Sequence, residues 1–495
     1  MRRALLVGCA ALIVAAAFFF ARPPAAGGPA LRDFESYYAA GSVWHGGGDP
    51  YGREIWRAER AIPGVVATRE ELLPFVGPAF ALPLWATLAK LPYAWATAAW
   101  SVVLGLALVT IALGSLRLAR GSPDRLDALA ILLFCAGFGP LTSGVGLGQV
   151  AIVSCAAIVA FVFALDARSR FGGVAGGIAA ALAAALQPNL GLVLAARLRE
   201  RRSWIVLTAA AGIVLAGSLA ALGGLPGLLR YFALLREHGE AERFIAIQTT
   251  VASVAHAFGI SDATAQALAA FLALAAVGIT VAFFRAQRYD AAGKVAIACA
   301  VAPLVLPFSH EHDFTISFFP ALLVLRCASG FQRRVAAVGF MLLAVDWLGL
   351  AQRPESLRYA TLLTLGAGLA LVALTAKRPA LSDAWPLVFA PLAYITGRIA
   401  SLDPLPVWPN ALGPAFAPAP GLGATQVWEL EQYLCGIAAQ DWTWGALRAL
   451  SLLGATIVWG VALVALARSP VRVIREGFAP LGAATSDASG VRLLP

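Results

Sequence analysis

The sequence predicts an all-α protein that crosses a membrane many times. Hydrophobic residues make up 60% of the chain and charged residues only 13%. A soluble domain cannot bury so large an apolar share, so most of the surface must face lipid. Apolar runs of roughly 17–25 residues, the length that spans a bilayer, recur along the chain. We place about twelve spans, near residues 4–20, 94–116, 126–142, 149–165, 204–223, 264–284, 293–308, 314–327, 335–350, 359–376, 384–400 and 442–467.

The net charge of +10 comes from short basic clusters between these runs. With this set of spans, every cluster falls on the same side as both termini, and the positive-inside rule makes that side cytoplasmic. A basic groove with interleaved aromatic residues is missing, so we expect no nucleic-acid partner. The clusters are Arg117 and Arg120, Arg168 and Arg170, Arg197–Arg202, Arg285 and Arg288, Arg333 and Arg334, Lys377 and Arg378, and Arg468–Arg475.

Residues 171–200 do not fit a simple crossing. An Ala/Gly-rich run is broken at Gln187-Pro188-Asn189, and the chain then returns to a basic cluster at 199–202. Proline removes a backbone donor and disfavours helix at the residue before it. Broken backbone at membrane depth is tolerated only where protein or a water-filled cavity covers it. We therefore predict a re-entrant hairpin that lines a cavity.

Three loops are predicted on the external side, at about 21–93, 224–263 and 401–441. Amphipathic stretches in the first loop predict short helices along the membrane interface, where tryptophan and tyrosine anchor well. The Gly/Ala/Ser-rich residues 476–495 predict a disordered cytoplasmic tail. A soluble catalytic domain is not predicted, so any chemistry belongs to the helices and these loops.

An acidic motif with aromatic neighbours follows the first predicted span. Asp33 and Glu35 lie two positions apart, and Tyr37 and Tyr38 come next. Two residues at this spacing point about 200° apart on a helix, so the acids are not a matched acid/base pair. A single carboxylate at the mouth of an apolar cavity gains basicity from desolvation. The alternative is a pair of solvated loop acids beside Arg32.

A second polar motif, Ser309-His310-Glu311-His312-Asp313, separates two apolar runs on the same predicted face. Ionisable side chains at the edge of a span are candidates for function. Two histidines and two acids also fit a metal site by residue type, but their spacing in a tight turn converges poorly. We prefer contact of His310 or His312 with a lipid phosphate, with Asp313 nearby, and expect no metal. A plain polar turn is the third possibility.

Two glutamines interrupt apolar runs. Gln149 follows Gly148 at the external side, where it either hydrogen-bonds a sugar hydroxyl or caps a helix. Gln187 stands at the break of the predicted hairpin. We include both among the expected substrate-binding residues.

Taken together, these motifs resemble glycosyltransferase family 87, which comprises polyprenyl-phosphate-mannose-dependent enzymes of the GT-C class. The resemblance covers roughly residues 1–380 and rests on the order of the motifs. The family usually has Tyr-Pro-Pro where this chain has Val76-Gly77-Pro78, and often Lys-Pro where it has Gln187-Pro188. Four features match: Asp33 with Tyr37-Tyr38 and Gly48-Asp49-Pro50-Tyr51, the run from Pro78 to Trp100, Gly148-Gln149, and the turn from His310 to Asp313.

The resemblance implies a GT-C fold with an external active site beneath interfacial helices. It implies inverting transfer of a hexose, expected to be mannose, from a polyprenyl-phosphate sugar to a lipid-linked or envelope glycan acceptor. Asp33 corresponds to the general base. We expect the following residues to bind substrate: Glu35, Tyr37, Tyr38, Gln149, Gln187, His310, His312 and Asp313. No cofactor is required, because the donor carries its own leaving group.

On this basis residues 1–380 form the catalytic core. Residues 381–475 add C-terminal helices with the loop at 401–441, and 476–495 form the tail. The protein is expected in the bacterial inner membrane, with its site facing the periplasm. The competing class is a transporter or flippase of lipid-linked sugars, because many spans and a broken helix suit that function too. Against a carrier, the two halves show no repeat and the first external loop is long.

Overall fold

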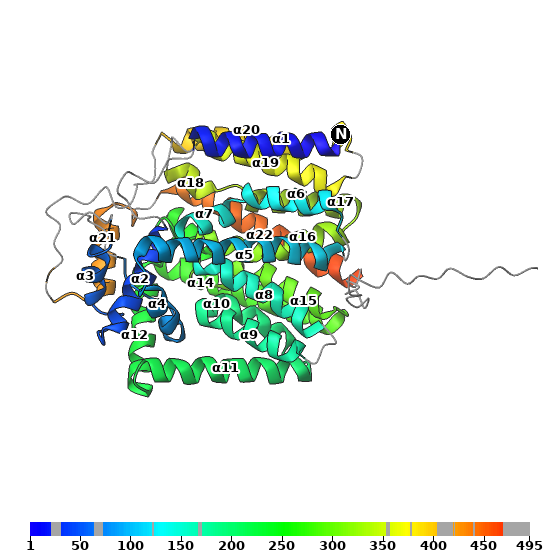
Figure 1. Cartoon of the computed structure of the whole chain (residues 1–495). Coiled ribbons are helices and arrows are strands. Elements are labelled where there is room, and N and C mark those ends of the chain that lie inside the picture. Colours follow the sequence, from blue (N-terminus) through cyan, green and yellow to red (C-terminus); the bar gives the residue numbers. More distant parts are fainter. Residues whose placement is uncertain are drawn as a thin grey trace, which may run out of the picture.

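The computed structural model describes residues 1–20, 31–63, 73–120, 123–166, 171–352, 357–376, 379–402, 419, 421–438 and 441–468. Every regular element within these residues is a helix, which confirms the predicted all-α class. The longer helices run side by side and form one bundle (Figure 1). The predicted tail at 476–495 and much of the loop at 401–441 lie outside the described residues.

Six described helices are long and apolar enough to cross a membrane, so the chain is a polytopic membrane protein. A seventh candidate is the pair α6 (Arg125–Ala136) and α7 (Gly139–Leu147), which is bent by 65°. The expected count of about twelve is therefore not confirmed. The six are α1 (Arg2–Ala15) with its continuation to Phe19, α5 (Tyr93–Arg120), α11 (Arg201–Ala221), α14 (Asp262–Ala286), α19 (Leu357–Thr375) and α22 (Trp442–Arg468).

Shorter helices occupy the remaining predicted spans. At 1.5 Å per residue, the 10 residues of α16 extend about 15 Å, half of a hydrocarbon core. Most residues of α8 and α15 are buried, so these two helices form the interior of the bundle. The shorter helices are α8 (Val150–Asp166), α15 (Ala291–Val305), α16 (Phe318–Cys327), α17 (Gly330–Ala344), α18 (Trp347–Gln352) and α20 (Phe389–Ala400).

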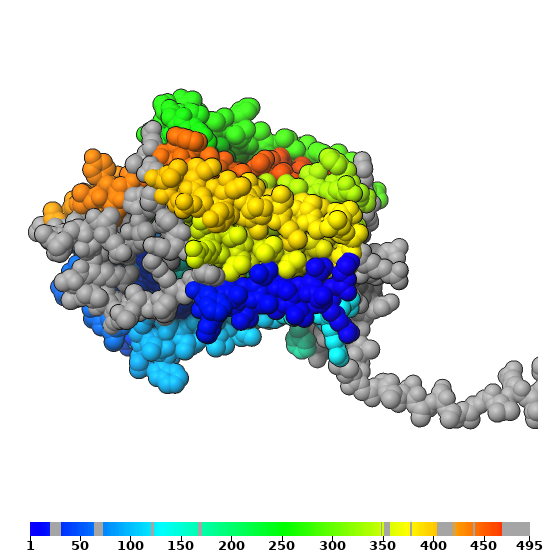
Figure 2. Space-filling view, turned by 90° about the horizontal axis from the view of Figure 1, so that it is seen from above, coloured from blue at the N-terminus to red at the C-terminus, as the bar shows by residue number. Residues whose placement is uncertain are grey.

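The first helix is fixed to the bundle by an arginine at its start. Arg2 donates from Nε to the carbonyl of Ala373 at 2.7 Å, and its guanidinium pairs with Asp124 at 3.1 Å and with Asp127. Figure 2 shows α1 in blue lying along the yellow surface of α19 and α20. These contacts place the N-terminus at the end of the bundle where α6 begins.

The predicted break at Gln187-Pro188 is present. Helix α9 (Gly172–Leu186) ends there, and Gln187 has an extended conformation with φ −149° and ψ 86°. The chain then forms α10 (Pro188–Gly191) and the 3-10 helix η3 (Leu192–Arg197). A Cβ at Gly191 would lie 3.3 Å from the backbone of Ala184, so the chain folds back on α9. Whether this hairpin enters the membrane and returns remains a prediction.

Short helices gather at the end of the bundle opposite the N-terminus, at the left of Figure 1. Three of them come from the first predicted external loop, as expected from its amphipathic stretches. The others come from the second and third loops. They are α2 (Arg32–His45), α3 (Glu54–Arg60), α4 (Leu82–Leu88), α12 (Leu225–Ala241) and α21 (Ala424–Leu434), with α13 (Val251–Ala257) packed on α22.

Candidate active site

Helix α2 holds Asp33 through the aromatic residue that follows it. Phe34 is fully buried, stacks on Trp100 with ring centroids 5.9 Å apart, and meets the edge of Trp85 at 6.4 Å. Farther along α2, a Cβ at Gly41 would lie 2.3 Å from the backbone of Trp85, so only glycine allows this approach. The helix is thus clamped against α4 and α5, and Asp33 has a fixed position at its start.

Gln149 connects α2 to the start of α8. Its amide nitrogen donates to the Asp33 carboxylate, and its oxygen accepts from the Tyr37 hydroxyl at 3.2 Å. The preceding Gly148 has φ +82° and ends α7 in a left-handed conformation, and its carbonyl accepts from the Trp100 indole at 2.8 Å. We expected Gln149 to bond a sugar hydroxyl or to cap a helix. In the structure its side chain instead bonds Asp33 and Tyr37, and so orients the predicted base.

The histidine turn begins the 3-10 helix η4 (Glu311–Ser317). The Asp313 carboxylate caps it, because Oδ2 accepts from the backbone N–H of His310 at 2.9 Å. The other oxygen, Oδ1, accepts from Nε2 of Gln187 at 2.5 Å. The break after α9 and the histidine turn, separated by more than a hundred positions, therefore meet in one place.

Electrostatic effects link Asp33 to the histidine turn. Burial raises the pKa of Tyr37, and the negative charges of Asp33 and Asp313 raise it further. Burial lowers the pKa of His312. The negative charges of Asp313 and Asp33 raise this pKa, whereas the positive charge of His310 lowers it further. Contacts also link them: Gln149, which donates to Asp33, donates its backbone N–H to the carbonyl of Gly144 at 2.8 Å, and a Cβ at Gly144 would lie 3.4 Å from Cβ of His312. The acidic motif and the histidine turn thus form one site.

A second group of contacts lies on the far side of His310, around Glu242, which is only 2% exposed. Its Oε2 lies 3.2 Å from Nε2 of His310 and accepts from Gln248 at 3.0 Å. Its Oε1 accepts from the indole of Trp428 on α21 and lies 3.4 Å from Nε2 of His238. One buried carboxylate therefore joins α12, η4 and α21.

The contacts of Glu242 favour its ionised form. Burial opposes the charge of Glu242, but the charge of His238 and the hydrogen bonds from His310 and Trp428 outweigh it and lower the pKa to about 2. Burial also opposes the charge of His310, while the hydrogen bond and charge of Glu242 raise its pKa to about 9. The sequence analysis did not single out Glu242. Only the helical spacing of His238 and Glu242, which puts both on one face, hints at it.

Two predicted site residues are not brought into contact with this cluster. The Tyr38 hydroxyl donates to the carbonyl of Leu91 at 2.8 Å. Glu35 is buried, but it projects from the opposite side of α2, about 200° from Asp33. The structure therefore brings together Asp33, Tyr37, Gln149, Gln187, His310, His312 and Asp313, and adds Glu242.

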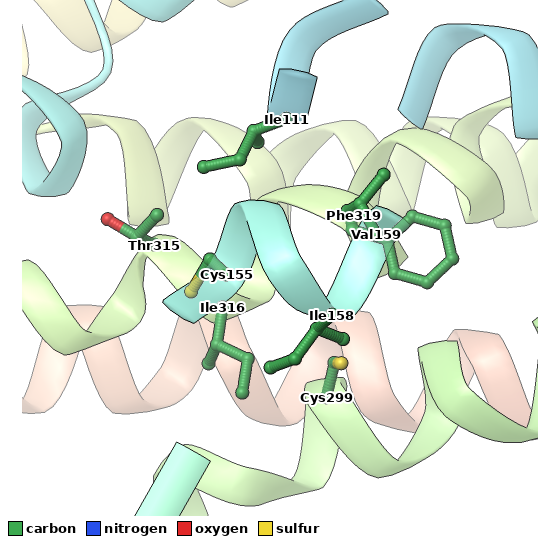
Figure 3. Close-up of a pocket in the computed structure, with 8 residues that line it drawn as sticks. All are labelled: Ile111, Cys155, Ile158, Val159, Cys299, Thr315, Ile316 and Phe319. Carbon is green, nitrogen blue, oxygen red and sulfur yellow. The ribbon is translucent and has the colours of Figure 1, made fainter. Parts of the chain in front are cut away.

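The described residues contain no group of three or more His, Cys, Asp or Glu side chains arranged to hold a metal ion. A small apolar cavity lies behind η4, between α5, α8, α15 and α16 (Figure 3). Its polar lining atoms come from Cys155, Cys299 and Thr315. It lacks a charged group, so we do not place the reaction there.

Comparison with known proteins adds one result. Residues 75–309 match the sequence model of Glycosyltransferase family 87, while no curated protein and no solved structure matches the chain. The matched segment is shorter than the roughly 1–380 expected. It includes Gln149, Gln187 and Glu242 but begins after Asp33 and ends just before His310. Residues 75–309 of this all-helical polytopic chain are therefore similar to glycosyltransferase family 87, and the match, which covers just under half of the chain, supports a membrane glycosyltransferase.

Proposed function

We propose that this enzyme transfers a hexose, expected to be mannose, from a polyprenyl-phosphate sugar to a lipid-linked or envelope glycan acceptor. Asp33 acts as the general base. The observation that carries the proposal is that Gln149, which bonds Asp33, also bonds Gly144, which lies against His312. The whole family match separates Asp33 from His312 in the sequence. This pairs a base with groups suited to a phosphate in one site.

The chemistry requires one proton acceptor and a stabilised leaving group. Asp33 takes the proton of the acceptor hydroxyl, whose oxygen forms a bond to the anomeric carbon of the donor. The bond from that carbon to the phosphate oxygen breaks, and polyprenyl phosphate leaves with the electron pair. Attack from the face opposite the leaving group inverts the anomeric centre. A phosphate is a good leaving group, so one carboxylate is sufficient.

Two features support the assignment of residues to the two substrates. Gln149 and Tyr37 orient the Asp33 carboxylate, which is what a base aimed at one hydroxyl requires. The imidazoles of His310 and His312 lie beside it, with ring centroids 5.5 Å apart, where charge develops on the departing phosphate. Tyr38 and Glu35, which lie outside the cluster, remain predicted substrate contacts through the resemblance alone.

The orientation in the membrane is part of the proposal. The site lies at the end of the bundle away from the N-terminus and Arg2 (Figure 1). Arg197, the last residue of η3, pairs with Asp166 at 3.1 Å and with Glu200 at 2.7 Å. These pairs place its positive charge next to the end of α8 and the start of α11. The positive-inside rule then gives a periplasmic site in the inner membrane. The family assignment favours an enzyme over the transporter alternative.

The test uses the purified protein in detergent with polyprenyl-phosphate mannose as donor. Membranes from a deletion strain supply the unmodified acceptor. We expect mannose to appear in a lipid or envelope glycan with the anomeric configuration opposite to that of the donor. Activity with a nucleotide sugar but not with the lipid phosphosugar, or retention of configuration, would contradict the proposal.

A further inference from the structure

The contacts of His310 determine the protonation of its ring. Nε2 lies 3.2 Å from the Glu242 carboxylate, and Nδ1 lies 3.3 Å from the carbonyl of Ile247. Both oxygens are acceptors, and an acceptor faces a ring nitrogen favourably only when that nitrogen carries a proton. Gln248 Nε2, at 3.4 Å from His310 Nε2, already donates to the same carboxylate at 3.0 Å. The arrangement is that of an imidazolium.

The same contacts occupy His310, whereas no hydrogen bond holds the buried His312 ring among the described residues. Both N–H groups of His310 point at protein acceptors. The nearest carboxylate oxygen to the His312 ring, Oδ1 of Asp313, is 3.8 Å from Nε2, which is too long for a hydrogen bond. The rings are tilted by 30° to each other. A ligand in the site therefore meets the His312 ring as a hydrogen-bonding group and the His310 ring as a charge.

We propose that Glu242 is a positioning residue that keeps His310 permanently positive beside the donor phosphate, while His312 supplies the direct contact. This rests on the proposed function, because it concerns how the same site recognises a phosphodiester. Glu242 itself does not touch the substrate.

The charge balance of the site explains why such a residue is needed. Asp33 and Asp313 both act on the site and would repel an anionic donor. The groups facing His310 are Glu242 and His238 from α12, and Asp313 and His312 from η4. Of these, His238 and His312 have pKa values lowered first of all by burial. The Glu242–His310 pair is neutral overall, but its positive end, His310, is the end that lies next to His312 and Asp313.

The carbonyl that faces Nδ1 is also held in place. Arg448 of α22 is buried and donates to the carbonyl of Gln248 at 2.6 Å and to that of Ile245 at 3.2 Å, on either side of Ile247. Ser309 donates its backbone N–H to Oε1 of Gln248 at 3.0 Å. These contacts hold the loop after α12 in place, and with it the Ile247 carbonyl that faces the His310 ring.

The experiment measures binding of farnesyl methyl phosphate to the purified full chain in detergent. This phosphodiester keeps one negative charge from pH 5.5 to 8.0 and carries no sugar, and farnesol is the uncharged control. Glu242→Gln is compared with Glu240→Gln. Glu240 lies in the last turn of α12, just before Glu242, and has an exposed side chain. Glu242→Asp, which restores the charge, is the conservative variant.

We expect wild type and Glu240→Gln to bind the phosphodiester equally well at both pH values. Glu242→Gln should bind about tenfold more weakly at pH 8.0 and recover at pH 5.5, because His310 without its carboxylate is charged only in acid. Glu242→Asp should restore binding at pH 8.0. An unchanged, pH-independent affinity of Glu242→Gln, or an equal loss of farnesol binding, would overturn the inference.

A second measurement observes the wild-type protein directly. Nitrogen NMR of histidine-labelled wild-type protein reports the protonation of its five histidines. One ring, assigned to His310 through His310→Gln, should stay doubly protonated at pH 8.0; a neutral ring there would overturn the inference. If wild type itself prefers farnesol to the phosphodiester, the proposed donor fails instead, so the two failures are distinct.

Discussion

The side chain of Gln149 donates a hydrogen bond to the carboxylate of Asp33, 116 positions earlier in the chain. A carboxylate only accepts hydrogen bonds, so the amide must turn its nitrogen toward Asp33 and its oxygen toward Tyr37. The Tyr37 hydroxyl then donates to that oxygen at 3.2 Å. This contact fixes the orientation of one oxygen of the Asp33 carboxylate, Oδ2.

Gln149→Leu should lower kcat by roughly 100-fold with little change in donor KM, because a loosely held base loses alignment with the acceptor hydroxyl. Tyr37→Phe, which removes only the contact that fixes the amide, should lower kcat by about tenfold. Steady-state kinetics with a polyprenyl-phosphate sugar measure both. A Gln149→Leu enzyme with unchanged kcat would show that Asp33 does not depend on this orientation.

Gln187→Leu should destabilise the protein by about 1–3 kcal/mol, because Oδ1 of the buried Asp313 loses its donor. Gln187→Lys should recover that stability, because an ammonium group can pair with the same carboxylate. The midpoint of thermal inactivation in detergent reports both changes. Equal midpoints for the leucine and lysine variants would contradict the role given to Gln187.

Arg448→Met should cost at least about 2 kcal/mol, because buried acceptors in the loop after α12 and in α13 lose their donor. Arg236→Met is the matched control: Arg236 is 76% exposed and its contact with Glu240 is 3.8 Å. That change should stay within about 0.5 kcal/mol. If the two variants lose the same thermal stability, Arg448 does not support the loop.

The Glu242–His310 pair predicts how stability varies with pH. The His310 pKa rises from 6.5 to about 9, so its contribution is complete below pH 6.5 and is lost as the pH rises through 9. The Glu242 pKa falls from 4.5 to about 2, so its contribution is complete above pH 4.5 and is lost toward pH 2.

The stability difference between wild type and Glu242→Gln should therefore be largest between pH 4.5 and 6.5. It should shrink on both sides of that window. Thermal inactivation of the two proteins across pH 4 to 9 measures it. A difference that grows steadily from pH 6.5 to pH 9 would have the wrong sign for this pair.

Composition and apolar runs were sufficient to predict the helical class and the positions of the long apolar helices, but not those of the short helices in the external loops. They were not sufficient for the number of crossings. The interior helix α8 is apolar on every face because protein surrounds it, and such a run looks the same as one surrounded by lipid. Helix α14, by contrast, is mostly exposed in the structure, as expected for a lipid-facing span. Sequence periodicity does not separate these two environments.

The site could be predicted in part. Asp33, His312 and Asp313 were identified because charged groups beside apolar runs are costly. Gln149 and Gln187 were identified at breaks, although their actual partners, Asp33 and Asp313, follow only from the fold. Glu242 was missed because it follows an amphipathic helix that carries other acids and bases. In such a segment the sequence pattern does not distinguish a buried carboxylate from a solvated one.

The most direct test of the central claim is the rate of sugar transfer by Asp33→Asn, compared with Asp49→Asn. Asp49 is an exposed acid of the same loop that bonds the backbone N–H of Tyr51 at 3.0 Å. With saturating polyprenyl-phosphate sugar and acceptor membranes, we predict that Asp33→Asn loses at least about 1,000-fold in rate, although it folds and binds farnesyl methyl phosphate. Asp49→Asn should keep wild-type turnover. Turnover by folded Asp33→Asn within tenfold of wild type would contradict the account.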